Sequence, residues 1–321
     1  MTLPDSNGYS LAATFKAAGD PMRLEILRIM ERDSFGVLEL CKIFAVQQPS
    51  MSHHLKVLAK AGLVATRREG NSIFYFRGGS GNRFVQKSLN QFFDLVDQTE
   101  LPQSRREALE AIRIARQAQA AEFFRTHAER FREQQDLIAG HKDYGTALIE
   151  RLSSSAAESW LEVGAGDGQL LAACAEHYQH VFALDISDEL LGQAQQRTPQ
   201  VLRSRIRFIH GDTKRAREGL VQADVVTCNM VLHHVPSPAA VVQDLAAMTK
   251  AGGRVIITDL DEHDQDWART ACGDLWLGFT HQQLDSWATD AGLEQTSSQF
   301  LALRNGFRVQ IKEYANRRTS V

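Results

Sequence analysis

Three glycines and one acidic residue in the second half of the chain have the spacing of a nucleotide-binding site. Gly164, Gly166 and Gly168 fall in LEVGAGDGQL, directly after an expected strand and at the start of an expected helix. Glycines at this place permit a tight turn and a close approach of backbone amides to a ligand. Asp185 ends the next expected strand, where a carboxylate can bind both hydroxyls of a ribose.

The charges around this loop favour a methyl donor over a dinucleotide. Glu162 stands two residues before the first glycine, and Asp167 lies inside the loop. A pyrophosphate site usually has the pattern GxGxxG, and carboxylates would repel that ligand, whereas they would attract an ammonium or a sulfonium. We therefore expect S-adenosylmethionine or S-adenosylhomocysteine. A nucleotide-free α/β domain that kept its turn glycines is the alternative.

Polar residues also follow the other expected strands. Asp212 ends the run IRFIHGD, and Asn229 follows the fourth strand in ADVVTCNM. The carboxyl ends of parallel strands meet at one edge of a sheet, where open α/β sheets bind ligands. The expected ligand-binding residues are Glu162, Gly164, Gly166, Asp167, Gly168, Asp185, Ile186, Asp212, Thr213 and Asn229.

Two adjacent histidine pairs raise the question of metal binding or acid–base catalysis. His53 and His54 fall in the expected helix SMSHHLKVLAKAGL, and His233 and His234 fall in NMVLHHVPSP beyond the fourth strand. No further ligands converge on His53 and His54 in the sequence, so we expect no metal there, and no metal ligand is assigned elsewhere in the chain. The second pair is either structural or supplies a base that takes a proton from an acceptor. No catalytic residue is assigned.

The elements that must position these residues fall into three segments. Residues 156–321 contain the β-branched runs SWLEVGA, HVFALDI, IRFIHGD, ADVVTCNM and GRVIITDL between helical patterns, which indicates an α/β domain with a mostly parallel sheet. Residues 99–155 are rich in Ala, Glu, Gln and Arg and predict a helical linker. This linker is either a connecting helix that packs on its neighbours or a dimer-forming arm.

Residues 1–98 have the pattern of helix, helix, turn, helix and hairpin. Asp20 can cap a helix that begins at Pro21. A later helix, QPSMSHHLKVLAKAG, has a core face formed by Met51, Leu55 and Leu58. The strand-like runs LVATRRE and SIFYFR are separated by Gly70-Asn71, a hairpin signal. This α+β segment is therefore expected to be a winged helix-turn-helix.

Composition and charge agree with two domains that differ in their partners. The chain has 321 residues, 43% of them hydrophobic, which suits two domains with buried cores. The net charge of −3 divides into +4 over residues 1–85, −1 over residues 86–155 and −6 over residues 156–321. Only the first part is therefore expected to meet a polyanion. We expect neither a signal segment nor a membrane span. Four widely spaced cysteines are typical of buried thiols in a cytoplasmic protein.

The segment from Trp160 to about Leu293 is similar to class I S-adenosylmethionine-dependent methyltransferases of the ubiquinone-biosynthesis type. The matching pieces are LEVGAGDGQL, ALDIS, GDTKRA and ADVVTCNMVLHHVPSPAAVVQDLAAMTKAGGRVIITDL. The resemblance implies a Rossmann-like fold in which Asp185 holds the ribose hydroxyls, while Asp212 and Thr213 border the adenine. The methionine part would lie along Glu162, Gly164 and Gly166.

Residues 11–78 resemble the ArsR/SmtB family of winged-helix repressors in FKAAGDPMRLEILRIM, AVQQPSMSHHLKVLAKAGLV and RREGNSIFYF. The family's metal sensors carry thiolates in a stretch that aligns with residues 35–39, where Gly36 and Leu38 stand here. Cys41 lies outside that pair, and the helix after the wing lacks the ligands of the family's second known site. The resemblance therefore implies a DNA-binding protein without a metal effector.

The resemblance also implies which residues touch DNA. The recognition helix would present polar side chains to base edges and phosphates in the major groove, and the wing would reach adjacent phosphates. The expected DNA-binding residues are Gln48, Ser50, His53, Lys56, Arg67 and Arg68. His54 would anchor the helix against the backbone. Winged helices of this family bind as two-fold dimers, so the operator should be an imperfect palindrome of double-stranded DNA bound by a homodimer.

Two functions remain open. The first is a repressor whose methyltransferase-like domain binds S-adenosylmethionine or S-adenosylhomocysteine as effector, a fusion that resembles regulators of methionine-cycle genes. The second is an active small-molecule methyltransferase with an autoregulatory DNA-binding domain. Methylation of DNA bases is not expected, because Asn229 is followed by Met-Val-Leu rather than by Pro-Pro and an aromatic residue, and Cys228 follows Thr227 rather than proline.

Overall fold

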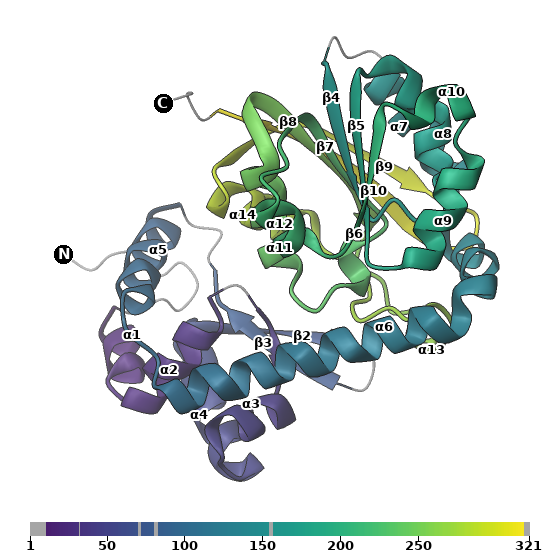
Figure 1. Ribbon diagram of the computed structural model, residues 1–321. Helices are drawn as coiled ribbons and strands as arrows, with labels where there is room; N and C mark the ends of the chain where they lie inside the picture. Colours follow the sequence, from purple (N-terminus) through teal and green to yellow (C-terminus); the bar gives the residue numbers. More distant parts are fainter. Residues whose placement is uncertain (1–10, 32, 70–71, 80–82, 154–156, 318–321) are drawn as a thin grey trace. The chain divides into compact units, whose positions relative to one another are not determined.

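The computed structural model describes residues 11–31, 33–69, 72–79, 83–153 and 157–317. The chain forms two compact units, residues 1–116 and 117–321, and the boundary falls inside the long helix α6 (Gln103–Ala139) (Figure 1). The linker proposed at 99–155 therefore contributes to both units.

The first unit is a winged helix-turn-helix, as the sequence predicts. Its sheet has the strand order β1-β3-β2 and is antiparallel. Its elements are α1 (Leu11–Ala18), α2 (Pro21–Ile29), β1 (Phe35–Gly36), α3 (Val37–Phe44), α4 (Gln48–Lys60), β2 (Val64–Glu69), β3 (Ser72–Arg77) and α5 (Arg83–Asp97), followed by the first part of α6.

Local sequence signals account for these elements. Asp20 is the N-cap of α2 and accepts a hydrogen bond of 3.0 Å from the amide of Arg23, and Pro21 occupies the first turn. The core face predicted for α4 is buried. Strands β2 and β3 pair over their whole length, and the turn Gly70-Asn71, which the sequence analysis used as the hairpin signal, lies outside the described residues.

Arginines hold the beginning of α6 against the winged helix. Arg113 binds the buried carboxylate of Asp33 through Nη2 at 2.6 Å and Nε at 3.1 Å. Arg116 binds both oxygens of Glu39, at 2.8 and 2.6 Å. Arg105 lies 3.1 Å from Glu25. Each pair joins residues about 80 positions apart in sequence, so α6 is part of this unit and not a free connector at this end.

The second unit is an α/β domain built on a seven-stranded sheet. The strand order is β6-β5-β4-β7-β8-β10-β9. The first five strands in this order are parallel, while β10 runs antiparallel to both β8 and β9. The strands are β4 (Ser159–Val163), β5 (His180–Asp185), β6 (Ile206–His210), β7 (Ala223–Asn229), β8 (Thr249–Leu260), β9 (Leu293–Ala302) and β10 (Arg308–Asn316).

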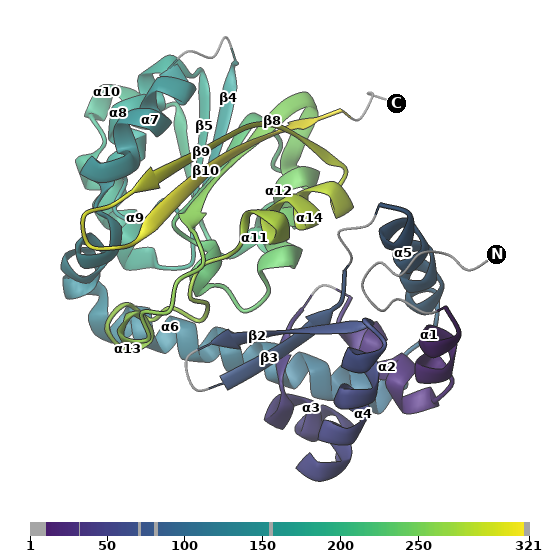
Figure 2. The ribbon, with the colours of Figure 1, turned by 180° about the vertical axis from the view of Figure 1, so that it is seen from behind.

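Helices cover both faces of this sheet, as Figures 1 and 2 show. One face carries α7 (His141–Ser153), α8 (Gln169–Cys174), α9 (Asp188–Arg197) and α10 (Gln200–Arg203). The other carries α11 (Thr213–Glu218), α12 (Pro238–Met248) and α14 (His281–Asp290). The short segments η1 (Ala175–His177), η2 (Leu232–His234) and α13 (Trp267–Cys272) complete the unit.

The five runs read as strands in the sequence are β4 to β8, and the mostly parallel sheet is confirmed. Strand β4 is buried along its whole length because it lies at the centre of the sheet between covering helices. Strand β10 was not predicted from the sequence. In the described part of the chain, no helix has the length and apolar character needed to cross a membrane.

Candidate cofactor and DNA-binding sites

The glycine loop between β4 and α8 needs its glycines. Gly164, Gly166 and Gly168 have φ of 73°, 54° and 79°, in the left-handed region that side chains with a Cβ rarely adopt. A Cβ added at Gly164 would lie 2.1 Å from Cγ2 of Val231, and one added at Gly168 would lie 2.7 Å from Cα of Ala194. The loop therefore holds its backbone in a conformation and at a packing distance that larger residues would prevent.

Asp185, at the end of β5, is bonded to this loop. Its Oδ2 accepts a hydrogen bond of 2.8 Å from the amide of Gly166, and its Oδ1 accepts one of 2.8 Å from the amide of Ser187. Burial raises the pKa of this carboxyl above its ordinary value, although the amide donors act in the opposite direction. Each carboxylate oxygen keeps a further lone pair, so the site can accept more donors.

Glu162 is a buried carboxyl at the base of the loop. Its side chain is on β4, the residue is 2% exposed, and its Oε2 has no hydrogen-bond partner among the described residues. Burial, and then the charge of Asp185, raise its pKa well above the usual range. Tyr144 of α7 approaches the same place and is hydrogen-bonded to Asn229 at the end of β7; burial raises the pKa of Tyr144 to about 12.

The remaining expected ligand residues lie around this centre with local partners. Asp167 pairs with Arg197 at 3.1 Å. Asp212 caps α11 and accepts a 2.9 Å bond from the amide of Arg215. The hydroxyl of Thr213 donates a hydrogen bond of 2.6 Å to the carboxylate of Asp244. Ile186, which follows β5, is exposed. Because β6, β5, β4 and β7 are neighbours in the sheet, the residues at their carboxyl ends share one edge.

A second cluster of buried titratable groups lies at the ends of β7 and β8. His233 Nδ1 is 2.7 Å from Oδ1 of Asp259, and its Nε2 is 4.0 Å from Oδ1 of Asp274. His234 Nδ1 is 3.6 Å from the same oxygen, and its Nε2 is 2.9 Å from Nε2 of Gln135 at the end of α6. These side chains, unlike those at the glycine loop, come from η2, from β8 and from the segment after α13.

The electrostatics of this cluster follow from burial and from the two carboxylates. Burial lowers the pKa of His233, but Asp259 and Asp274 outweigh it and raise that pKa to about 9. Burial and the charge of His233 lower the pKa of His234 well below its usual value. Sequence reasoning singled out the histidines and missed both aspartates. Asp259 could have been found, because ITDL also places a carboxylate at a strand end.

The expected DNA-contacting residues of α4 lie on its outer face. Gln48, Ser50, His53 and Lys56 are all exposed, while His54 is half-buried with Nδ1 3.8 Å from Oδ1 of Asp20.

The wing requires one correction. Arg67 was expected to reach phosphates, but it is 8% exposed, so its guanidinium is not presented to solvent. Arg68, the next residue on β2, is exposed because successive side chains of a strand point to opposite faces.

The start of α3, where related metal sensors carry thiolates, is built from other groups. Gly36 is the N-cap, and its amide donates a 2.8 Å bond to Oε2 of Glu39. Leu38 is 62% exposed. Arg116 binds Glu39 and the carbonyl of Ser34 at 2.9 Å. The linker helix α6 thus contacts the place where a metal effector would bind in those sensors.

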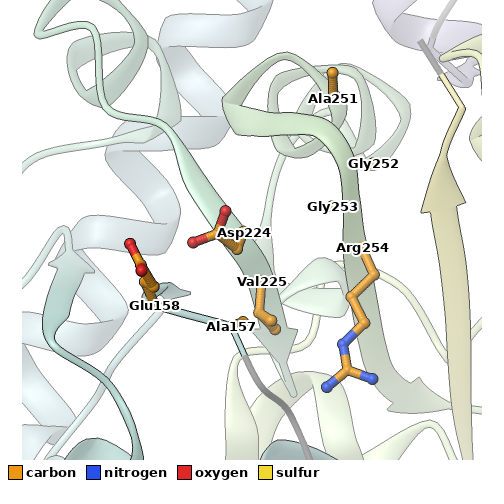
Figure 3. A pocket seen from close by; sticks show the side chains of 8 residues that line it. All are labelled: Ala157, Glu158, Asp224, Val225, Ala251, Gly252, Gly253 and Arg254. Carbon is orange, nitrogen blue, oxygen red and sulfur yellow. The ribbon is translucent and has the colours of Figure 1, made fainter. Parts of the chain in front are cut away.

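A pocket at the opposite edge of the sheet does not coincide with the glycine loop. Figure 3 shows it at the amino ends of β4 and β7 and along β8. Asp224 in its wall accepts hydrogen bonds from Ser159 and lies 3.1 Å from Nζ of Lys250, and Arg254 binds Glu313 at 3.0 Å. Asp224 and Arg254 are therefore each paired with a residue outside the pocket lining. The lining residues are Ala157, Glu158, Asp224, Val225, Ala251, Gly252, Gly253 and Arg254.

The fold and the loop define a methyltransferase-type α/β domain joined to a winged helix of the bacterial regulator type. The chain belongs to the methyltransferase domain family, which it matches over residues 107–298. Residues 20–66 match the bacterial regulatory proteins of the arsR family. The chain is thus an ArsR-type DNA-binding regulator fused to a methyltransferase domain.

Three relatives each match one part of the chain. An uncharacterised HTH-type transcriptional regulator of Methanocaldococcus jannaschii is 39% identical over 90 residues, which are 27% of this chain and 91% of the relative. A ubiquinone biosynthesis O-methyltransferase of Methylococcus capsulatus is 30% identical over 161 residues, 46% of this chain and 68% of the relative. A Haloferax volcanii methyltransferase, solved in complex with the Trm112 methyltransferase activator, shares the fold with a TM-score of 0.51 and 16% identity, over 62% of this chain and 97% of that one.

Proposed function

We propose that this chain is a repressor whose methyltransferase-like domain binds S-adenosylmethionine or S-adenosylhomocysteine as effector. In this proposal residues 1–98 bind DNA, residues 99–155 couple the two ends, and residues 156–321 bind the ligand. The observation that carries it is the continuous helix α6, since its first part is bonded to the winged helix and its last residues belong to the ligand-binding unit.

The contacts at the far end of α6 support the coupling. Ile138 and Ala139 pack in one apolar cluster with Tyr144 and Met230. Met230 follows Asn229, to which Tyr144 is hydrogen-bonded. A ligand that orders Asn229 would therefore favour one arrangement of Tyr144 and of the helix end. A ligand changes DNA affinity only through a difference in its affinity for two states of the protein, and this contact offers a route for such a difference.

The residues of the glycine loop fit the adenosyl ligand. The unpartnered, buried Oε2 of Glu162 suits the ammonium of the methionine part, and the remaining lone pairs of Asp185 suit the ribose hydroxyls. Asp212 and Thr213 would border the adenine, with exposed Ile186 offering it an apolar contact. The backbone of Gly164, Gly166 and Gly168, with Asp167 between them, would approach the ligand closely, because no Cβ stands in the way.

In this proposal the exposed face of α4 binds DNA. Gln48, Ser50 and His53 would contact bases or phosphates, and Lys56 together with Arg68 of the wing would contact phosphates. A homodimer would bind an imperfect palindrome whose half-sites lie about one helical turn, roughly 10 base pairs, apart. The regulator would act in the cytoplasm, on genes of the methionine cycle.

An active methyltransferase with an autoregulatory DNA-binding domain is the second candidate. The observation that favours it is the pair His233–Asp259, which lies beyond the end of β7 and resembles a base oriented by a carboxylate. One matched relative is a ubiquinone biosynthesis O-methyltransferase, so the acceptor would be a small molecule with a hydroxyl group. S-adenosylmethionine would then be consumed and not only sensed.

Calorimetry with both ligands, with and without operator DNA, tests the proposal. Typical coupling energies are about 1–3 kcal/mol, which corresponds to a change in operator affinity of about 5- to 150-fold. By reciprocity the operator must change the ligand affinity by the same factor. If saturating S-adenosylmethionine and S-adenosylhomocysteine both bind but leave operator affinity unchanged, the effector role is wrong and the catalytic candidate replaces it.

A further inference from the structure

The buried cluster around His233 offers a different kind of site from the glycine loop. One nitrogen from each of His233 and His234 and one oxygen of Asp274 lie within 4.8 Å of one another. All three side chains are almost fully buried. The backbone holds them together, because the amides of Leu275 and Trp276 both donate to the carbonyl of His233, at 2.8 and 3.1 Å. The segment that carries Asp274 is therefore fixed beside η2.

The orientation of His233 points its Nε2 atom into this cluster. Its Nδ1 is bonded to Asp259 at 2.7 Å, and Asp259 is itself held by the amides of Leu232 and Leu260 at 2.9 and 2.8 Å. The other nitrogen, Nε2, has no hydrogen-bond partner among the described residues and faces Asp274 at 4.0 Å. A carboxylate that fixes one nitrogen of an imidazole while the other nitrogen binds a metal is the usual outer-shell arrangement in metalloproteins.

We propose that His233, His234 and Asp274 form a binding site for a divalent transition-metal ion such as zinc. Ligand atoms around a tetrahedral ion with bonds of about 2.1 Å are about 3.4 Å apart, so the observed 3.6 and 4.0 Å need only a small inward movement. Two imidazoles and one carboxylate suit zinc, iron or nickel and not magnesium or calcium, which prefer oxygen ligands. Three protein ligands leave one position for water or a substrate atom.

The second imidazole also has a partner for its outer nitrogen. His234 Nε2 lies 2.9 Å from the side-chain amide of Gln135. His234 Nδ1 lies 3.4 Å from the carbonyl oxygen of Gly273. Metal binding through Nδ1 would replace this contact, and the Gln135 amide would turn so that its oxygen accepts the hydrogen bond from Nε2. Gln135 belongs to the end of α6, so an ion at this site would also fix the last turns of that helix.

This site lies beyond the proposed adenosyl function, and it can be tested without ligand or DNA. Full-length protein is dialysed against a chelator and then titrated with Zn²⁺ by calorimetry and with Co²⁺ by visible absorption. We expect one ion per chain in the wild-type protein. His234→Ala and Asp274→Asn should abolish this binding, and Asp259→Asn should weaken it about 10- to 100-fold, as losses of outer-shell partners do.

A matched control removes two exposed histidines of the same unit. His177 and His180 lie outside the cluster, so the double variant His177→Ala/His180→Ala should bind the ion as the wild type does. The wild-type titration alone decides whether a site exists, even if a cluster variant fails to fold. If the wild-type protein does not bind one ion per chain, the proposal is wrong. The negative charges of Asp259 and Asp274 would then be neutralised by a protonated His233 and not by a metal ion. Undiminished binding by Asp274→Asn would overturn it as well.

Discussion

The arginines at the start of α6 should be required for communication between the adenosyl ligand and the operator. The perturbation is the double variant Arg113→Ala/Arg116→Ala. It removes the guanidinium groups that bind Asp33 and Glu39 at 2.6 Å. Neither residue belongs to the glycine loop or to the outer face of α4. The variant should therefore change how the winged helix is held by α6 without removing a ligand contact or a DNA contact.

The magnitude follows from the burial of the two pairs. The side chain of Asp33 is 1% exposed, but Arg113 is 38% exposed, so solvent screens that pair in part. An exposed pair contributes about 0.2–1 kcal/mol, and breaking a fully buried pair costs about 3–5 kcal/mol. We therefore expect the loss of each ion pair to cost roughly 1–2 kcal/mol, which lies between these limits. The loss of both pairs should cost about 2–4 kcal/mol. Typical allosteric couplings are about 1–3 kcal/mol, so these pairs are strong enough to transmit one.

The assay is a fluorescence-anisotropy titration of a labelled operator with and without saturating S-adenosylhomocysteine. In the wild type the two dissociation constants should differ by about 5- to 150-fold. In the double variant they should agree within about twofold, while calorimetry shows ligand affinity near that of the wild type. Arg106→Ala is the matched control, because Arg106 is an exposed arginine of the same helix, and it should keep the full response.

If the double variant binds operator and ligand normally and still shows the wild-type ratio of dissociation constants, the coupling does not pass through these pairs. A ligand-free operator affinity within about threefold of the wild type would establish that the winged helix of the variant is folded, so that the comparison is valid.

Four further outcomes are expected. Asp185→Ala should weaken adenosyl-ligand binding by about 2–3 kcal/mol, as expected for a lost buried charge-assisted pair, and leave ligand-free operator affinity unchanged; unchanged binding by calorimetry would remove Asp185 from the site. Lys56→Ala or Arg68→Ala should flatten the salt dependence of operator affinity by about one unit for each lost phosphate contact, and an unaltered slope would contradict that role. Burial, and then Asp185, raise the pKa of Glu162 well above its usual range, so binding of a cationic ligand, which favours the carboxylate, should release a proton and strengthen as pH rises. Calorimetry in buffers of different ionisation enthalpy would measure that proton, which Glu162→Gln should abolish. Arsenite should leave operator affinity unchanged, and a gel-shift response to arsenite that disappears in Cys41→Ser would contradict this.

Features that depend on a few neighbouring residues could be predicted from the sequence. Asp20 before Pro21 predicts the start of α2, because an N-cap oxygen and a proline both act within one helical turn. The glycines at 164, 166 and 168 predict a left-handed loop, because the steric restriction acts within each residue. Alternation of β-branched runs with helical patterns then suffices to predict a parallel α/β sheet.

Features that depend on packing could not be predicted in the same way. Arg67 was expected to contact phosphates because it lies on the wing, but its burial depends on what covers that face of β2. The wall of the proposed cofactor site includes Tyr144 from α7, whose hydrogen bond to Asn229 joins residues far apart in the chain.

The two modules could be predicted from the residue pattern alone, and so could groups of residues with local spacing, namely the glycine loop with Asp185 and the polar face of α4. Which distant charges pair with one another depends on the packing of the folded chain. Arg113 pairs with Asp33 across 80 positions, and His233 lies between Asp259 and Asp274. The physical reason is that propensities, caps and glycine sterics act over a few residues, whereas the partner of a buried charge is selected by how whole helices and strands pack.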